Sequence, residues 1–323
     1  MEKLVEIKDL SVRFNTDSGV VHAVNHLNLI IGKGETVGFV GETGAGKTTS
    51  ALAIMKLLEC PPCEITSGEI FVNGKDLMKV KEKEMFHIRG NVISMIFQDP
   101  MTSLNPTMTV GAQIAEVLKI HQNLSAEELK KKTEEMLGLV GIRPERVNDY
   151  PHQFSGGMKQ RVVIAIALAC NPELIIADEP TTALDVTIQA QVLELMKELK
   201  EKYNTSMLLI THDLGVVAET CDNVAVIYAG SIVENASVEK LYTNPCHPYT
   251  LGLFNSIPSL DEDIEKLQVI AGNPPDPSNL PSGCRFHPRC NKCMEICKTQ
   301  FPPTVEVEAG HFVACHLFKA KEE

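Results

Sequence analysis

The segment from Gly41 to Thr48 reads GETGAGKT and has the G-x4-G-K-[ST] spacing of a phosphate-binding loop. Glycines let backbone N–H groups wrap around phosphates, and the helix that follows adds its positive end. Lys47 is expected to reach the β- and γ-phosphates, and Thr48 is expected to bind Mg²⁺. The alternative is a plain glycine turn, which the intact Gly-Lys-Thr disfavours. The predicted ATP-binding residues here are Gly41, Glu42, Thr43, Gly44, Ala45, Gly46, Lys47, Thr48 and Thr49.

A second candidate site is the apolar run LIIADE, which ends in two acids, Asp178 and Glu179. A buried strand would deliver Asp178 to the Mg²⁺ shell, while Glu179 would orient or deprotonate the attacking water. The alternative is a buried strand whose acidic end is merely solvated. Together with the phosphate loop, the pattern favours hydrolysis of a nucleoside triphosphate.

A third candidate is Ser155-Gly156-Gly157, within FSGGMKQR. Ser-Gly-Gly at the start of a helix offers a hydroxyl and unencumbered N–H groups, which suit a phosphate. Taken alone, it is more often a simple helix start. Because one chain rarely needs two phosphate cradles, we expect this segment to cap a nucleotide that a different chain holds.

In order, the chain carries GETGAGKT, Gln98 in IFQDP, FSGGMKQR, LIIADEP, Ala183-Leu-Asp185 and Thr211-His212. This order, over residues 4 to about 235, resembles the ATPase subunits of ABC transporters. The resemblance implies a P-loop α/β fold with antiparallel β and helical subdomains. It also implies two ATPase domains arranged head to tail, each ATP lying between one chain's phosphate loop and the other chain's Ser-Gly-Gly segment.

The resemblance further implies residue roles. Gln98 would contact Mg²⁺ and the attacking water, His212 would contact the γ-phosphate, and Asp185 would cross the dimer interface. Phe14 is the candidate for stacking on adenine, since a flat ring suits a base. The implied catalytic set is Glu179, His212 and Gln98; the Mg²⁺ ligands are Thr48, Gln98 and Asp178; and the residues that contact the other chain's ATP are Ser155, Gly156, Gly157 and Gln160.

Two stretches narrow the family further. QDPMTSLNP after Phe97, followed by Gly111-x-Gln113, looks like the oligopeptide/dipeptide permease family, as do Cys246–Thr250 and the nearby Ser-Ile-Pro. ALACNPELIIADEPTTALDVTIQAQ is closer to the D-type ATPase subunit of these importers than to its F-type partner. The family implies a heterodimer with an F-type paralogue, two transmembrane permease subunits and an extracytoplasmic peptide-binding protein. Nickel or another small solute is the alternative cargo.

The alternative hypothesis is a soluble ABC ATPase that acts on ribosomes or DNA, and the composition of the chain argues against it. The 323 residues carry a formal net charge of −12, which disfavours a nucleic-acid surface. The start, MEKLVEIKDL, has no apolar signal-peptide core, and the apolar run Val162–Cys170 is too short to span a bilayer. We therefore expect a peripheral protein on the cytoplasmic face of the membrane, with no nucleic-acid partner.

Apolar periodicity predicts strands over 5–14, 21–31 and 36–40, a hairpin turning at Asn73-Gly74 and a helical region over 101–170. Within that region Ser125 and Glu128 form a predicted capping box. Strands and helices alternate afterwards, which implies a parallel sheet. The Pro-rich stretch after residue 255 sets the expected domains: 1–255 for the ATPase and 256–323 for a Pro- and Cys-rich segment.

Five of the ten cysteines lie near the end of the chain. In a reducing compartment they suit a metal better than disulfides. The four at wide spacing are Cys284, Cys290, Cys297 and Cys315, and the family tail G-C-x-F-x-P-R-C matches this segment, with Cys293 spare. The resemblance allows a [4Fe–4S] cluster on these four thiolates. Zinc and unligated thiols remain alternatives, as does a regulatory cluster that gates ATP turnover.

For the other cysteines, the sequence predicts no metal site. Cys60-Pro-Pro-Cys63 is a tempting redox pair, but its place between a helix and a hairpin favours a loop. Cys170 and Cys221 are predicted to be core residues.

Overall fold

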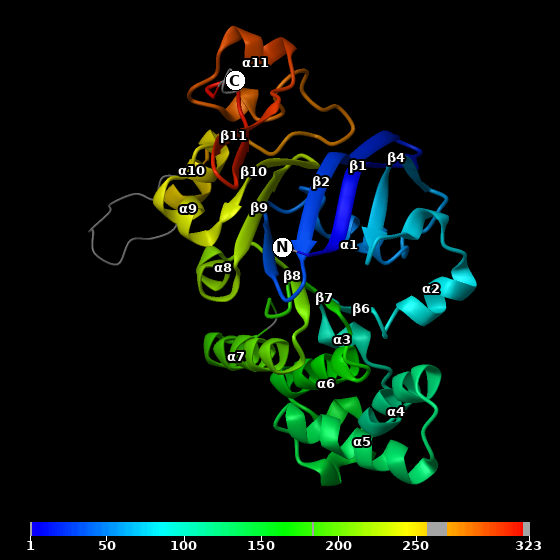
Figure 1. The fold of residues 1–323 in the computed structure, drawn as a ribbon. Helices are drawn as coiled ribbons and strands as arrows, with labels where there is room; N and C mark the ends of the chain where they lie inside the picture. The colour runs from blue at the N-terminus through cyan, green and yellow to red at the C-terminus, as the bar shows by residue number, and fades with distance from the viewer. Residues whose placement is uncertain (1, 183, 257–269, 319–323) are drawn as a thin grey trace. The chain divides into compact units, whose positions relative to one another are not determined.

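The computed structural model describes residues 2–182, 184–256 and 270–318 of the chain (Figure 1). Ala183, the Ile-Pro of the predicted Ser-Ile-Pro motif and the acidic stretch before the Pro-rich segment lie outside these residues. The chain divides into two compact units. The first unit comprises Met1–Leu4, Ile31–Thr36 and Asp76–Ile210, and the second comprises Val5–Ile30, Val37–Lys75 and Thr211–Glu323.

The sheet of the first unit consists of parallel strands in the order β6 (Ile93–Ile96), β7 (Leu174–Asp178) and β8 (Ser206–Thr211). Every residue of the three strands is buried. Continuous apolar strands of this kind are typical of a parallel sheet covered by helices. The predicted strand LIIAD is confirmed, and its last residue, Asp178, lies at the carboxyl end of the sheet.

Helices make up most of the rest of the first unit, and Figure 1 shows α4 and α5 as neighbours within it. The capping box at Ser125 is confirmed, because Ser125 accepts from the Glu128 N–H and the Glu128 carboxylate accepts from the Ser125 N–H. The helical elements are η1 (Leu77–Lys79), α2 (Glu82–Ile88), α3 (Pro100–Ser103), α4 (Val110–His121), α5 (Ala126–Leu139), η2 (Pro144–Asn148), η3 (Pro151–Gln153), α6 (Gly156–Leu168) and α7 (Val186–Tyr203).

The second unit contains a largely antiparallel sheet in the order β2-β1-β4-β5. Its strands are β1 (Lys3–Thr16), β2 (Gly19–Gly32), β4 (Cys63–Val72) and β5 (Lys75–Asp76). The predicted hairpin is confirmed, since Asn73 and Gly74 join β4 to β5 with φ of 50° and 73°. Positive φ at both positions matches the twist of a two-residue hairpin.

The other strands of the second unit follow the order β11-β12-β10-β9-β3. They are β3 (Thr36–Val40), β9 (Asn223–Tyr228), β10 (Ser231–Ser237), β11 (Thr304–Glu308) and β12 (His311–Ala314). The apolar segment NVAVIYAGSIVE forms two strands and not one, because Ala229 and Gly230 adopt φ of 48° and 82° and turn it into an antiparallel hairpin. β12 then pairs with β10, so the end of the chain extends this sheet.

The helices of the second unit are α1 (Lys47–Ile54), α8 (Leu214–Thr220), α9 (Val238–Thr243), α10 (Pro248–Asn255), η4 (His287–Arg289) and α11 (Glu295–Thr299). Its core includes three packed rings, Tyr228, Tyr249 and Phe286, each at most 3% exposed. Within the described parts of the chain, we find no helix with the length and apolar character needed to cross a bilayer.

Candidate functional site

The phosphate loop joins β3 to α1 in the second unit. Gly46 has a φ of 101°, and a Cβ there would lie 2.4 Å from the carbonyl oxygen of Ala23. At Gly41 a Cβ would lie 2.3 Å from the carbonyl oxygen of Ile227. These two positions therefore require glycine, one for its dihedral angle and both for the close approach of another backbone segment.

Lys47 begins α1 and turns back over the loop. Its Nζ donates to the carbonyl oxygens of Gly41 and Glu42 at 2.7 and 3.1 Å. Thr48 is exposed and Thr49 half-buried at the N-terminus of the same helix. The ammonium and the helix N-terminus thus lie together at the loop, an arrangement suited to an anion.

Glu42 has partners that the sequence reasoning missed. Its carboxylate accepts two hydrogen bonds from Arg289, at 2.7 and 3.0 Å, and its N–H donates to the Tyr249 hydroxyl at 2.9 Å. Burial raises the pKa of Tyr249 well above its usual range, so the hydroxyl stays neutral. The sequence could have indicated this contact only by offering an acid in the loop and an arginine elsewhere. Because the chain contains many acid–arginine combinations, that signal does not single out Glu42 and Arg289.

Glu179 follows β7 in the first unit and adopts a φ of 46°, which is uncommon for a residue with a side chain. One of its carboxylate oxygens accepts hydrogen bonds from Gln98 Nε2 and Thr182 Oγ1, both at 2.9 Å. Its N–H donates to the carbonyl oxygen of Ile210 in β8. The carboxylate is therefore fixed in direction, and two of the predicted catalytic residues lie in direct contact.

The remaining candidates occupy varied positions. Asp178 is only 3% exposed, whereas Asp185 is exposed and caps α7 by accepting from the Ile188 N–H. His212 is exposed in the second unit, and Phe14 is half-buried in β1 opposite Cys63 of β4. The predicted Mg²⁺ ligands are divided, with Gln98 and Asp178 in the first unit and Thr48 in the second.

The Ser-Gly-Gly segment begins α6. Ser155 is the N-cap and accepts from the Met158 N–H at 3.4 Å, while Ser155 and Gly156 are exposed. Gln160 is fully buried in this chain, and neither polar atom of its side chain has a hydrogen-bond partner among the described residues. Its contact with a neighbouring chain's ATP stays a prediction, and it requires this side chain to become accessible.

Gly157 fits closely against α7. A Cβ at this position would lie 2.4 Å from Cγ2 of Ile188, whereas at Gly156 the nearest atom would be Leu184 Cδ2 at 3.9 Å. We expect Gly157→Ala to lower the free energy of unfolding by about 1–3 kcal/mol, the usual cost of overpacking. Urea denaturation measures it. Gly156→Ala is the matched control, expected within about 0.5 kcal/mol of wild type; equal losses in both variants would contradict the clash.

The cysteine-rich segment lies in the second unit. Cys297 and Cys315 are buried, at 7% and 8% exposure, while Cys284, Cys290 and Cys293 are half-buried. Burial, with smaller contributions from the thiols of Cys297, Cys315 and Cys290, raises the pKa of Cys284 to about 11. Burial and neighbouring thiols also raise the pKa of Cys290 and Cys315. Ionising the thiols of Cys284, Cys290 and Cys315 is therefore costly, and a bound cation would relieve that cost.

The simpler cysteine predictions can be compared directly. Cys60 lies in the connection from α1 to β4, as predicted, whereas Cys63 is the first residue of β4 and pairs with Phe14 of β1. Cys170 is buried, and Cys221 is half-buried against the core of the second unit.

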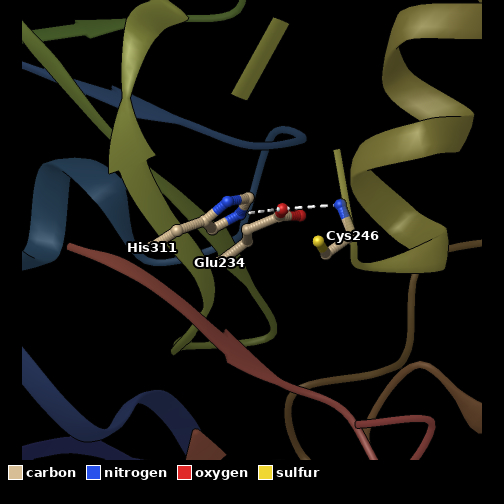
Figure 2. A group of neighbouring side chains, drawn as sticks. All are labelled: Glu234, Cys246 and His311. Carbon is tan, nitrogen blue, oxygen red and sulfur yellow. Dashed lines mark hydrogen bonds and ion pairs between the residues drawn. The ribbon is translucent and has the colours of Figure 1, made fainter. Parts of the chain in front are cut away.

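A different group of potential metal ligands, Glu234, Cys246 and His311, is buried within the second unit (Figure 2). Figure 2 shows the imidazole pointing at the carboxylate, and His311 Nε2 lies 2.8 Å from Glu234 Oε1. The same carboxylate accepts the N–H groups of Cys246 and His247 at 2.7 and 2.8 Å. Since Glu234 is fully satisfied by these partners, the group ties β10, β12 and the start of α10 together.

Comparison of the sequence and structure with known proteins identifies the family to which the chain belongs. Residues 24–182 match the family described as "ABC transporter", and residues 233–297 match "Oligopeptide/dipeptide transporter, C-terminal region". The Oligopeptide transport ATP-binding protein AppD of Bacillus subtilis (strain 168) is 52% identical over 321 residues, covering 99% of this chain and 98% of AppD. The chain belongs to the ATP-binding subunits of the oligopeptide and dipeptide ABC transporters.

Other relatives agree with this assignment. The Dipeptide transport ATP-binding protein DppD of the same organism is 49% identical over 325 residues, covering 100% of this chain and 97% of DppD. Among solved structures, the cassette MJ0796 bound to ADP and Pi has a TM-score of 0.65 at 29% identity, covering 72% of this chain and 98% of that one. The predicted family and its P-loop α/β fold are therefore confirmed, and this ABC transporter subunit is an ATPase.

Proposed function

We propose that this ABC ATPase couples ATP binding and hydrolysis to the uptake of oligopeptides or dipeptides. The observation that carries the proposal is that about half of the residues, over nearly the whole chain, are identical to those of relatives named for oligopeptide and dipeptide transport. The match includes the C-terminal region that is specific to this family. Peptide is recognised by other subunits, and the chemistry of this chain is the transfer of a phosphoryl group to water.

Glu179 is our candidate for orienting and deprotonating the water that attacks the γ-phosphorus, as the bond from that phosphorus to the leaving ADP oxygen breaks. Gln98 contacts Glu179 directly, at 2.9 Å, which suits a residue that senses the water and the membrane partner. Mg²⁺ would be held by Thr48, Gln98 and Asp178, and His212 would contact the γ-phosphate. Phe14 would stack on adenine.

The exposed N-terminus of α6 would serve a second ATPase chain. Ser155 and Gly156 are exposed, so a neighbouring chain's phosphates can approach them. Asp185 would contribute to the same interface. ATP binding would stabilise the closed arrangement of the two ATPase chains, and hydrolysis would allow the pair to open. The bound nucleotide would thus shift the equilibrium between a closed and an open state. The partner in this proposal is an F-type paralogue.

Two permease subunits and an extracytoplasmic peptide-binding protein complete the proposed importer. This chain would attach to the cytoplasmic face of the membrane through the permeases. The segment after Gln98, which contains α3, is the proposed docking place for a permease helix.

The function is tested with the importer purified through this chain and reconstituted in vesicles with its binding protein. We expect two permease chains and a second ATPase in the preparation, and ATP-dependent uptake of labelled tripeptides or dipeptides. Labelled nickel serves as the competing cargo. Uptake of nickel and of no peptide would overturn the peptide assignment, and recovery of ribosomes or DNA in place of permeases would overturn the importer.

For residues 256–323 we propose a separate cysteine-rich segment that carries a [4Fe–4S] cluster on Cys284, Cys290, Cys297 and Cys315. The support for this ligand set is that the four thiols are buried or half-buried in one segment, where ionising them is costly without a bound cation. Zinc is the alternative occupant of the same thiolates.

The proposed role of the cluster is structural. A segment of this size with many prolines buries little apolar surface by itself and needs a covalent or metal staple. When bound, the cluster would supply four iron–thiolate bonds that join the segment's turns, its helix α11 and the end of β12.

A further inference from the structure

Glu42 is the second residue of the phosphate loop, and both its side chain and its backbone are held from outside the loop. Arg289 Nη1 and Nη2 each donate to a different carboxylate oxygen, at 2.7 and 3.0 Å. This parallel fork is the strongest geometry for a guanidinium and a carboxylate. The Tyr249 hydroxyl accepts the Glu42 N–H. The loop is thus anchored to residues more than 200 positions along the chain.

Arg289 is itself immobilised. Its side chain is only 5% exposed, and its Nε donates to the carbonyl oxygen of Ala271 at 3.1 Å. The guanidinium also contacts the Tyr228 hydroxyl at 3.3 Å and lies 5.8 and 6.0 Å from the ring centres of Tyr228 and Phe286. Because these contacts fix the guanidinium, they fix Glu42 as well.

The segment that precedes Arg289 approaches the same loop. A cavity of about 210 Å³ is lined on one side by residues 42–45 and on the other by Pro274, Pro275 and Pro277. The carbonyl oxygen of Pro277 accepts the His22 N–H at 2.8 Å, which attaches the Pro-rich stretch to β2. Residues 274–289 therefore flank the phosphate loop at more than one point.

We propose that Arg289 is a positioning residue for ATP: by holding and neutralising Glu42, it keeps the phosphate loop ready for the triphosphate, so the cysteine-rich segment sets the affinity for ATP. Two physical effects support this. Phosphate binding depends on N–H groups held in fixed directions, and small displacements weaken it strongly. An unpaired Glu42 carboxylate would also repel the incoming phosphates. The inference rests on ATP binding by this loop and is independent of the transported solute.

The test measures the Kd of the full chain for a fluorescent ATP analogue with Mg²⁺. Arg289→Gln is expected to raise the Kd about tenfold, the scale of one lost charge-assisted contact. The matched control is Arg89→Gln, which removes another arginine that contacts both oxygens of a glutamate, Glu82, in the first unit. We expect that control to leave the Kd unchanged.

A double-mutant cycle distinguishes a role of Arg289 in positioning Glu42 from a general loss of structure in the variant. If Arg289 acts through Glu42, then Arg289→Gln in a Glu42→Gln background changes the Kd less than about twofold. Arg289→Lys keeps the charge without the fork and is expected to give an intermediate Kd. The same tenfold factor in both backgrounds, or an unchanged Kd in Arg289→Gln, would overturn the proposal.

Hydrogen exchange covers the case in which the glutamine variant loses stability. We expect faster exchange of the amides in residues 41–46 and unchanged exchange in β9, a core strand of the same unit. Uniformly faster exchange across the unit would assign Arg289 to stability alone and contradict the proposal. Failure of wild type to bind the analogue would instead refute the proposed ATPase function.

Discussion

Glu179→Gln is expected to lower ATP hydrolysis by the assembled transporter about 10²–10⁴-fold, the usual contribution of a positioned general base. Glutamine keeps the shape and can still accept a hydrogen bond, but it cannot take a proton from water. ATP binding should persist, because Glu179 is expected to act on the water and not on the phosphates. Phosphate release measures the turnover, and retention of labelled ATP measures the trapped nucleotide.

The control for this variant is Glu198→Gln, which makes the same change at an exposed glutamate on α7. We expect its turnover to equal that of wild type. Turnover of Glu179→Gln within about threefold of wild type would remove Glu179 from the role of base, since the lost general-base term is far larger. Loss of ATP binding together with turnover would point to damage at the Gln98 contact.

Cys297→Ser is expected to remove most of the iron from anaerobically purified protein and to lower the free energy of unfolding by about 2–5 kcal/mol, the scale for losing a staple in a small domain. Cys297 is the chosen position because it is buried and its thiol influences those of Cys284, Cys290 and Cys315. Iron and sulfide analysis, the visible absorption spectrum and urea denaturation measure the two effects.

Cys293→Ser is the matched control in the same segment. Cys293 is half-buried, and the sequence leaves it outside the predicted ligand set. We expect this variant to keep its iron, colour and stability. Colourless wild-type protein with stoichiometric zinc would refute the cluster, and iron loss from Cys293→Ser would refute the choice of four ligands.

The sequence determined the parts of this protein that depend on short-range interactions. The phosphate loop, the apolar strand that ends at Asp178, the capping box at Ser125 and the turn at Asn73-Gly74 each occupy a few consecutive residues. Their conformations follow from dihedral preferences and from neighbours within one helical turn. A short motif therefore predicts them without knowledge of the chain's path. The family followed from the order of several such motifs.

Only the tertiary structure decided which distant residues meet. Arg289 and Glu42 are 247 positions apart, and nothing in either local sequence names the other. The pairing of β12 with β10 and the contact of Gln98 with Glu179 arise in the same way. Gln160 follows the predicted Ser-Gly-Gly site by three residues, yet its position on α6 buries it in the protein core. The path of the whole chain determines these contacts, and local periodicity carries no information about that path.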